Sequence, residues 1–545
     1  MTEQALNSHE EWSFKLNPWI TMIPLMLSIF MFALDETISN VALPYMAGTF
    51  SVSHNESTWI ITSYLVASGI VIPAVDFFSK LIGRKQYFML SIVIFTVASI
   101  LCGISNSMAM MLFSRILQGV GGGGIMPIAQ AMIFEIFPKE KLSAAMAIFG
   151  LGVIMAPIMG PAVGGWLTEN FSWPFIYFIN IPFGIIALIL SHKFIEEPPY
   201  SKKQKNVTMD ISGFVFLALW LLTLQVVLDK GNDADWFNAT WICQLSAVSL
   251  FSFLTFVYIQ IKKSKTHTGL IDLSVLKNHN FLIGTMGQIV LMGVMMSSAS
   301  ILPSMLQSLL GYTSFLSGIS MVPRGAGCFL ASILCGIFVS KVGIKPVVTV
   351  GLIVLASAGL LFGEINTSIS LVDIAFPNFV FGLGMIMAMV PLANISCATL
   401  PNEAQTNASG VQNLLKNIGA AIGTSIATTM ITRFSQMHQH MMIKSLTETN
   451  SVYAERLNSM ISSFITQVDL PTATHMAQAQ IHNILRQQAT LWGYVETFRY
   501  FAVAVILILP FVCFLHDSVK AEKKNKNKHK IKRVYLWWAL EDSNF

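Results

Sequence analysis

Two adjacent carboxylates, Asp35 and Glu36, lie in the stretch ALDETISNVALP (33–44), inside an apolar run long enough to cross a membrane. An ionised side chain at the centre of a bilayer costs at least about 2.5 kcal/mol, so such residues usually serve function. Successive helix residues diverge by about 100°, so the two acids cannot face one partner. Glu36 has three interpretations: it faces a cavity, pairs with a neighbouring helix, or sits protonated in an apolar contact.

A buried cation occurs in SRILQGVGGGGIMP (114–127), where Gln118 lies on the same helix face as Arg115. A guanidinium does not lose its proton, so Arg115 must pair with a carboxylate, with backbone carbonyls or with cavity water. We interpret Arg115 as a fixed positive charge that holds a nearby carboxylate ionised in one state and releases it in another. The alternative is a structural contact with the backbone.

A further polar patch, Gln412, Asn413 and Lys416, interrupts an apolar run in the second half of the chain. Lining of a cavity and a satisfied network between helices are equally compatible with it. Arg324 in VPRGAG (322–327) is another candidate buried cation. The residues that we expect to line a substrate cavity are Glu36, Asn40, Gln118, Gln307, Gln412 and Lys416.

Composition indicates that these residues belong to a membrane protein. Of the 545 residues, 54% are hydrophobic and 11% are charged, whereas a soluble chain carries about 25% charged residues. Apolar runs of about 20 residues mark membrane-spanning helices. We predict an all-α integral membrane fold with fourteen such helices, at 18–46, 57–78, 87–106, 109–135, 142–168, 174–194, 210–229, 239–261, 281–308, 314–340, 346–365, 370–398, 409–432 and 493–515.

Loop charges predict the orientation of these helices. Lys and Arg gather in the loops that follow even-numbered helices, and such residues accumulate on the cytoplasmic side. We therefore expect both termini to be cytoplasmic. Residues 1–17 form a polar segment without the pattern of a cleaved signal. Residues 517–545 form a basic tail that anchors the topology or touches anionic lipid.

A weak internal repeat predicts duplicated halves. DFFSKLIGRK (76–85) aligns with GIFVSKVGIK (336–345), and each follows the second helix of a six-helix set. We expect two pseudo-symmetric six-helix bundles, at 18–195 and 281–516, with two inserted linker helices at 210–262. A substrate cavity would lie between the bundles near the middle of the bilayer.

The long segment 434–492 precedes the last predicted membrane helix on the outer side. Apolar residues at helical spacing run from Leu457 to Val468 and from Ala477 to Leu491, and Pro471 separates the two stripes. The pattern predicts an external helical hairpin. It would cap the mouth of the bundle or provide a docking surface.

Small residues recur every four positions in the predicted helix 142–168 and form a ridge that permits close helix approach. Two prolines with the same spacing would bend the helix. The pattern favours a conformational hinge, with ordinary tight packing as the alternative. The hinge candidates are Gly152, Pro157, Gly160, Pro161, Gly164 and Gly165.

The sequence lacks the motifs of enzymes and of metal or nucleotide sites. GGGG (121–124) lies inside a membrane helix and no GK[ST] follows it, so it is not a phosphate loop. The six cysteines form no CxxC pair, and two external histidines, His438 and His440, are interpreted as solvated. We expect no enzyme activity, no metal, no cofactor and no nucleic-acid partner. Transport would draw on an ion gradient.

Several stretches together carry a family resemblance. LDETISNVALP resembles the LDxTIxNVALP signature of the fourteen-helix drug:proton antiporters of the major facilitator superfamily. SRILQGVGGGGIMP resembles the fourth-helix motif, and APIMGPAVGGWL (156–167) resembles the antiporter motif of helix 5. WPFIYFINIPFG (173–184) and NASGVQNLLKNIGAAIG (407–423) also resemble family patterns. With its long loop before the last helix, the chain is similar to EmrB-type members.

The resemblance implies roles for individual residues. Asp35 would carry the proton and Arg115 would be its partner, while the hinge would couple opening to one side or the other. A cytoplasmic gating loop would contain Asp76, Gly83, Arg84 and Lys85. Here the chain departs from the pattern, since Asp76 replaces a Gly and Lys80 replaces an Asp. This departure puts the usual carboxylate contact of that loop in doubt.

The resemblance thus implies a proton-coupled multidrug efflux transporter in the inner membrane of a Gram-negative-type cell. Its cargo would be amphipathic drug-like small molecules taken from the lipid bilayer or cytoplasm. Its partners would be an EmrA-like periplasmic adaptor and an outer-membrane channel. Two alternatives stay open: a dedicated exporter of one metabolite, siderophore or fatty acid, and a non-transporting membrane sensor or scaffold.

Overall fold

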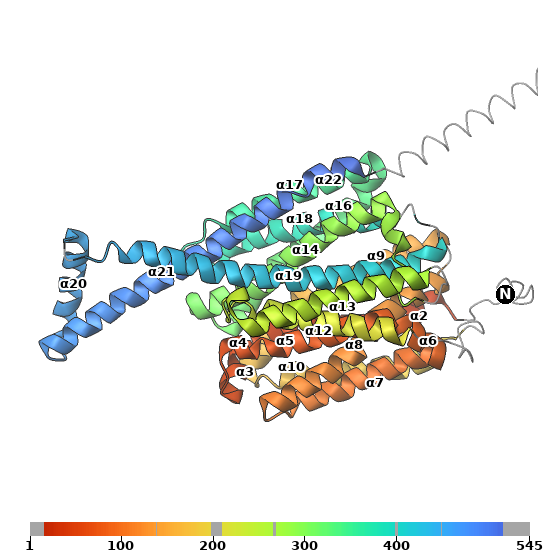
Figure 1. The fold of residues 1–545 in the computed structure, drawn as a ribbon, viewed down its shortest axis with the longest axis horizontal. Coiled ribbons are helices and arrows are strands. Elements are labelled where there is room, and N and C mark those ends of the chain that lie inside the picture. The colour runs from red at the N-terminus through yellow and green to blue at the C-terminus, as the bar shows by residue number, and fades with distance from the viewer. Residues whose placement is uncertain are drawn as a thin grey trace, which may run out of the picture.

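The computed structural model describes residues 16–137, 139–197, 210–264, 269–397, 400, 402–447 and 449–515. Within these residues every regular element is a helix, and the long helices run side by side along one axis (Figure 1). A helix satisfies its own backbone hydrogen bonds, which hydrocarbon cannot do. The predicted segments 1–17 and 517–545 lie outside the described residues, apart from Leu16 and Asn17.

The helices fall into a first and a second set along the chain. The first set contains α2 (Pro18–Ile38), α3 (Leu43–Phe50), α4 (His54–Ser57), α5 (Trp59–Val71), α6 (Val75–Ile82), α7 (Arg84–Gly103), α8 (Met108–Ile136), α9 (Lys139–Asn170), α10 (Phe175–Phe178), α11 (Asn180–Phe194), α12 (Ile211–Lys230) and α13 (Thr240–Ser264). The second contains α14 (His279–Ser304), α15 (Ser314–Ile319), α16 (Val322–Val342), α17 (Ile344–Phe362), α18 (Leu371–Cys397), α19 (Asn402–Ile443), α20 (Ser451–Phe464), α21 (Leu470–Ile506) and α22 (Leu509–Phe514).

Twelve helices in the described part of the chain are long and apolar enough to cross a membrane. They coincide with twelve of the fourteen predicted spans. At the other two positions lie the shorter apolar helix Trp59–Ala74 and α9, which has 32 residues. The chain is therefore a multi-pass membrane protein of helices, and the count of fourteen stays a prediction.

The first predicted span, 18–46, is not one continuous helix. It divides into α2, a 3-10 turn (Ser39–Val41) and α3. Pro44 stands in the first turn of α3, and proline cannot donate the backbone hydrogen bond that would continue α2. The break leaves Asn40 in the turn.

Buried apolar side chains form two large clusters. The first joins residues between Met22 and Ile195, and the second joins residues between Leu291 and Leu515. A third, smaller cluster packs Leu217 of α12 and Phe256 of α13 against α19. The helices before α12 and after α13 thus have separate cores, and the α12–α13 pair packs on both α5 and α19.

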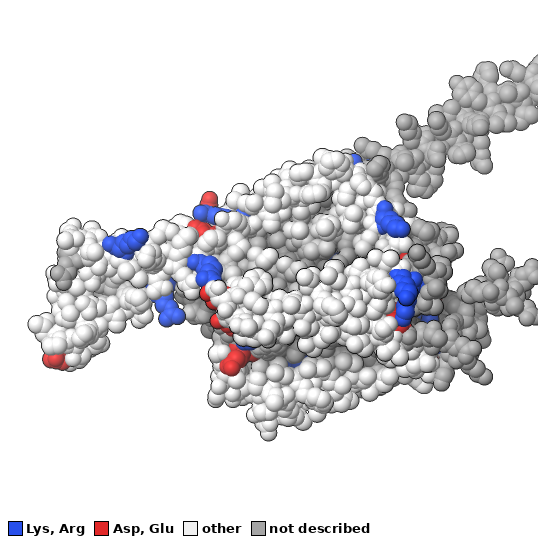
Figure 2. All heavy atoms as spheres, in the orientation of Figure 1, with Lys and Arg blue, Asp and Glu red and all other residues white. Residues whose placement is uncertain are grey.

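Charged residues are concentrated near the two ends of the helix bundle. On the face shown in Figure 2, Lys, Arg, Asp and Glu leave a broad uncharged band between these ends. Large apolar side chains are exposed along the outer helices, for example Phe251 and Tyr258 of α13 at 64% and 66%. Exposed apolar surface of this extent suits a lipid environment.

The aligned repeat forms the same corner twice. Gly83 joins α6 to α7 with φ 107°, and Gly343 joins α16 to α17 with φ 95°. These left-handed values favour glycine, because it has no Cβ. Two residues on, Lys85 Nζ donates to the carbonyl of His192 (2.8 Å), and Lys345 Nζ donates to that of Cys513 (3.0 Å). Each lysine thereby ties its corner to the last helix of its own core.

Two helices extend far beyond the bundle. α19 has 42 residues and α21 has 37, and together with α20 they form a projection opposite the N-terminus (Figure 1). Pro471 lies in the first turn of α21, where the sequence predicts the break. Ala477, Ile481 and Leu485 are buried, whereas Ile484 is exposed and no residue of α20 is buried. We call residues 434–492 the projection, and the end of the bundle that carries it the projection end.

Candidate functional site: a buried ion pair beside a cavity

Asp35 and Arg115 form a fully buried ion pair. Arg115 Nη1 lies 2.7 Å from Asp35 Oδ2, and both side chains are 0% exposed. The pair joins α2 to α8. Arg115 Nε also donates to the carbonyl of Ile60 at 3.0 Å, and its guanidinium lies 4.3 Å from the centre of the Tyr64 ring. Arg115 therefore contacts two of its three expected kinds of partner at once, a carboxylate and a backbone carbonyl.

The other oxygen of Asp35 accepts two neutral donors. Gln118 Nε2 and Asn180 Nδ2 each lie 2.8 Å from Asp35 Oδ1. Gln118 Oε1 in turn accepts from Arg115 Nη1 at 2.6 Å, and both amides also donate to Ser99 Oγ. The network draws on α2, α7, α8 and α11. The carboxylate thus receives charge-assisted hydrogen bonds on both of its oxygens.

Asn180 is a member of this network that the sequence analysis missed. It lies in WPFIYFINIPFG, where it is the one amide in an otherwise apolar segment. Such an amide inside a membrane helix needs a partner, and that is the signal that would have found it. Gln118 requires a correction: it is 0% exposed and bound within the network, so it does not line the cavity.

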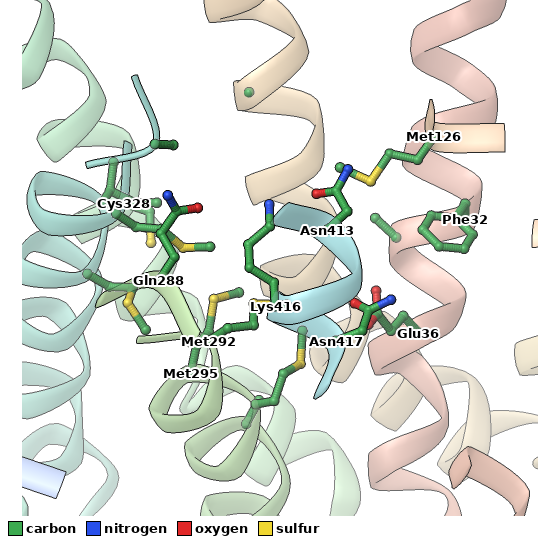
Figure 3. Close-up of a pocket in the computed structure, with 18 of the residues that line it drawn as sticks. Phe32, Glu36, Met126, Gln288, Met292, Met295, Cys328, Asn413, Lys416 and Asn417 are labelled. Atoms are coloured by element: carbon green, nitrogen blue, oxygen red, sulfur yellow. The ribbon is translucent and has the colours of Figure 1, made fainter. Parts of the chain in front are cut away.

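A cavity of about 300 Å³ lies between the two sets of helices. Its walls come from α2, α5, α8 and α9 on one side and from α14, α16, α18 and α19 on the other (Figure 3). Most of the lining is apolar. Seven methionines contribute to it: Met126, Met292, Met295, Met296, Met321, Met385 and Met389. Thioether side chains are flexible and polarisable, so this wall can adapt to cargo of different shapes.

Three charged residues line the cavity. Glu36 enters from α2 and Lys416 from α19 (Figure 3). The third, Arg324, belongs to α16. Of the three interpretations of Glu36, the structure thus shows the first. The adjacent acids on α2 have different surroundings, because Asp35 faces the buried network and Glu36 faces the cavity.

Three other expected cavity residues lie elsewhere. Asn40 occupies the turn between α2 and α3, and Gln412 is 6% exposed and is not one of the residues that line the cavity. Gln307 lies near α15, where its Oε1 accepts from Ser314 Oγ at 3.2 Å. These positions follow from the helix break at Pro44 and from the direction in which α19 presents Asn413 and Lys416. They correct the sequence interpretation.

The small-residue ridge of α9 contacts two different neighbours. A Cβ at Gly152, Gly160 or Gly164 would meet Met26, Thr37 or Ile38 of α2. A Cβ at Gly165 would meet the Ser314 backbone, and Pro161 approaches Gly318. α9 therefore packs tightly on α2 and on α15. α9 is helical throughout, and the side chain of Pro157 is outside the described residues, so the hinge stays a prediction.

The contact of α9 with α15 joins the two sets of helices at the projection end. Glu169 Oε1 accepts from the backbone N–H of Phe315 at 2.6 Å. Ser314 Oγ donates to the carbonyl of Val41 at 3.3 Å. We call this group of residues the α9–α15 contact. It brings backbone against backbone beside the cavity.

The predicted gating loop is tied to helices of its own set. Arg84 pairs with Glu135 at the end of α8. The backbone N–H of Lys85 donates to Glu197 Oε1 at 3.3 Å. The side chain of Asp76 lies outside the described residues. Whether this loop gates transport stays a prediction.

The described His, Cys, Asp and Glu side chains outside the network are paired or scattered. Among the described residues, no group of three or more His, Cys, Asp or Glu side chains could hold a metal ion. His438 is not simply solvated, as the sequence suggested, because its Nε2 lies 2.8 Å from Glu496 Oε1. The ring also stacks at 5.7 Å from Trp492. This pair joins α19 to α21 at the base of the projection.

Comparisons with known proteins extend over nearly the whole chain. Residues 25–424 match the family model described as Major Facilitator Superfamily. The chain is 33% identical to the probable multidrug resistance protein EmrY of Escherichia coli K12, over 92% of this chain and 96% of that protein. It is 30% identical to the multidrug export protein EmrB of the same strain, over 91% and 94%.

Among solved structures, the fold is similar to that of a bacterial homologue of the human lysosomal transporter Spinster. The TM-score is 0.55 at 16% sequence identity, over 91% of this chain and 96% of the other. The fold comparison and the sequence comparisons both indicate a membrane transporter fold. This chain therefore belongs to the major facilitator superfamily of membrane transporters.

Proposed function

We propose that this protein exports amphipathic drug-like small molecules in exchange for protons, by alternating access. The observation that carries the proposal is the arrangement on α2. A buried, ion-paired carboxylate, Asp35, stands directly beside Glu36, which faces a cavity lined by both sets of helices. A change of charge at Asp35 can thus act on the cavity through a single helix.

The chemistry of the pair supports proton coupling. While Asp35 is ionised, Arg115 and two amides hold α2 against α8 and α11. Protonation from the outside removes the charge that Arg115 compensates, and a buried guanidinium without its partner is strongly destabilised. α2 and α8 then favour a different arrangement. Because α2 also packs on the glycine ridge of α9, its movement strains the α9–α15 contact at the projection end.

The cavity supports a broad range of cargo. Its seven methionines can repack around different apolar molecules, as in other proteins with many ligands. EmrY and EmrB are named for multidrug resistance and multidrug export. Multidrug export is therefore favoured over a carrier built for a single metabolite.

We also propose that the chain crosses the membrane fourteen times, with Trp59–Ala74 and α9 as the two additional spans. The protein would lie in the inner membrane, with both termini in the cytoplasm. Loop charge supports this orientation. Labelling a cysteine at Ser107, in the loop between α7 and α8, tests it. A membrane-impermeant thiol reagent should label this cysteine from outside, and protection from the reagent would contradict the crossing of Trp59–Ala74.

Proteoliposomes with an imposed pH gradient test the transport proposal. We expect Asp35→Asn to abolish proton-driven export of a fluorescent amphipathic dye while exchange of dye for dye continues. The exchange reaction needs no net proton movement, so it also reports that the variant is folded. Glu56→Gln serves as control, because Glu56 is an exposed acid at the start of α4 whose capping role Gln can retain. Normal proton-driven export by Asp35→Asn would remove Asp35 from the mechanism.

A further inference from the structure

Tyr64 of α5 contacts both the buried ion pair and the cavity. Its ring centre lies 4.3 Å from the guanidinium of Arg115, and the side chain is 0% exposed. The same residue belongs to the cavity lining, whereas Asp35 and Arg115 do not. Tyr177, whose ring lies 5.6 Å from the guanidinium, is also absent from the lining. Of the two rings beside Arg115, Tyr64 is therefore the one on which cargo in the cavity can act.

Gly122, the second glycine of the run GGGG (121–124), makes room for this ring and for a second one. A Cβ at Gly122 would lie 2.9 Å from the ring of Phe32 and 3.2 Å from the hydroxyl oxygen of Tyr64. Phe32 also lines the cavity, one turn before Glu36 on α2 (Figure 3). The centres of the two rings are 6.2 Å apart. We call the rings of Phe32 and Tyr64 the aromatic cover.

The hydroxyl group of Tyr64 is buried, and it forms no hydrogen bond with the described residues. Buried hydroxyl groups are normally hydrogen-bonded, because burial without a partner is costly. In this arrangement the hydroxyl is not exposed to the cavity, so a partner from the cavity can reach it only when the ring moves. Cargo with a polar group can supply that partner. A movement of the Tyr64 ring would thus exchange its contact with Arg115 for a hydrogen bond to cargo.

We propose that the aromatic cover controls proton exchange between Asp35 and the cavity, and that cargo opens it through Tyr64. While the ring lies on Arg115, it separates the ion pair from water in the cavity, so the empty carrier does not pass protons. Cargo displaces the ring, and Asp35 then exchanges its proton with that water. Tyr64 is a positioning residue in this scheme, since it acts on Asp35 through Arg115. This inference rests on the proposed export function, for which it names the residue that links cargo to the proton.

Proton entry into proteoliposomes that contain no cargo tests the cover. A pH-sensitive dye inside the vesicles, pyranine, reports proton entry after the outside is acidified. We expect Tyr64→Ala to admit protons about tenfold faster than the wild-type protein, since opening the ion pair to the cavity no longer breaks a desolvated cation–π contact. Tyr64→Phe retains the ring and should stay close to the wild type. Tyr494→Ala, the same truncation at a buried tyrosine of α21 outside the cavity lining, should also stay close.

Two further variants show whether such a leak uses the ion pair and the cover. Adding Asp35→Asn to Tyr64→Ala should abolish the leak, because the proton passes through Asp35 and not through a water-filled hole. Gly122→Ala adds a methyl group against both rings of the cover, so it should also cause a leak. Gly150→Ala is its matched control, because Gly150 lines the cavity as well but a Cβ there meets nothing within 4 Å.

Three results would overturn the aromatic cover: proton entry by Tyr64→Ala at the wild-type rate, an equal leak in Tyr64→Phe, or a leak that persists after Asp35→Asn is added. Exchange of dye for dye shows that each variant is folded. If Tyr64→Ala does not fold, Gly122→Ala and its control decide. Dye export by the wild type with no leak in either variant refutes the cover alone, whereas a Tyr64-dependent leak without any dye export refutes the export function alone.

Discussion

At the scale of residues, the two adjacent acids of α2 differ in their burial and in their hydrogen-bond partners. Asp35 has no exposed surface and receives hydrogen bonds from Arg115, Gln118 and Asn180. Glu36, about 100° away around the helix, belongs to the cavity wall. α2 therefore carries one acid that is buried in a network of hydrogen bonds, and a second acid that cargo in the cavity can contact. This division lets proton and cargo occupy different sites while both act on α2.

The role of Asn180 gives a prediction at this scale. Asn180→Leu removes one of the two neutral donors to Asp35 Oδ1. We expect the rate of proton-driven export to fall about tenfold, because a hydrogen bond to a charged group contributes about 1.5 kcal/mol. Transport assays in proteoliposomes with an imposed pH gradient would measure this. Asn238→Leu, in an exposed turn, is the control. An unchanged export rate would show that Asn180 only packs.

The network also shows how far sequence patterns reach. Asp35 and Arg115 stand out because charges are rare in apolar runs, and their pairing could be expected from family motifs. Gln118 shares a helix face with Arg115, but the sequence cannot tell whether that face meets the cavity or another helix. The structure shows that Gln118 bridges both members of the pair. The partner of such a side chain depends on which helices are its neighbours in space. The spacing of residues along the sequence does not give this information.

At the scale of elements, α9 is central because its glycines pack on α2 of the first set and on α15 of the second. Its glycines let α2 and α15 approach the backbone closely. Such contacts have little side-chain bulk to rearrange, so they can separate and reform with small changes in other packing. The α9–α15 contact joins the two sets of helices at the projection end, so it must open if cargo leaves there.

Gly318 of α15 tests this role of the contact. A Cβ there meets the backbone oxygen of Pro161, so Gly318→Val should force α9 and α15 apart. We expect a cysteine introduced at Gln307, beside the contact, to react severalfold faster with a thiol reagent in this variant. Exposed Cys243 and Cys513 are replaced by Ser beforehand. Gly336→Val on α16 is the control, because a Cβ at Gly336 has open space. Equal labelling rates would mean that the contact does not govern access.

At the scale of the whole molecule, the projection gives the protein a reach beyond its membrane-spanning bundle. α19 and α21 continue as uninterrupted helices out of the bundle, and α20 packs on α21 (Figure 1). Val452 and Leu470 are exposed there at 73% and 56%. We propose that the projection binds a periplasmic adaptor, which connects the exporter to an outer-membrane channel.

Substitution on the projection tests the adaptor proposal. Val452→Lys with Leu470→Lys should reduce co-purification of the adaptor at least about tenfold, since removing apolar contacts from an interface core costs several kcal/mol. Proton-driven export in proteoliposomes that contain no adaptor should be the same for this variant and the wild-type protein. Val372→Lys, an exposed apolar position of α18 outside the projection, is the matched control. Undiminished co-purification would place the docking surface elsewhere.

The span pattern could be read from apolar runs because lipid imposes one length on every crossing helix. The ends of the helices could not be read in this way. α19 and α21 continue beyond the apolar runs because they pack against each other there, for example through the pair His438 and Glu496. α2 stops early because Pro44 interrupts it. Proline positions and contacts between helices set these helix ends, and the hydropathy of the sequence does not indicate either of them.

The methionine wall has one more consequence, which concerns oxidative damage. Oxidants convert a thioether to a sulfoxide, which is polar and chiral, and repair depends on dedicated reductases. A cavity that admits reactive cargo exposes seven such groups to it. Hypochlorite or peroxide would therefore turn an apolar wall into a polar one while the buried ion pair of α2 and α8 stays intact. The methionine side chains that let the cavity accommodate varied cargo would thus also make it sensitive to oxidation.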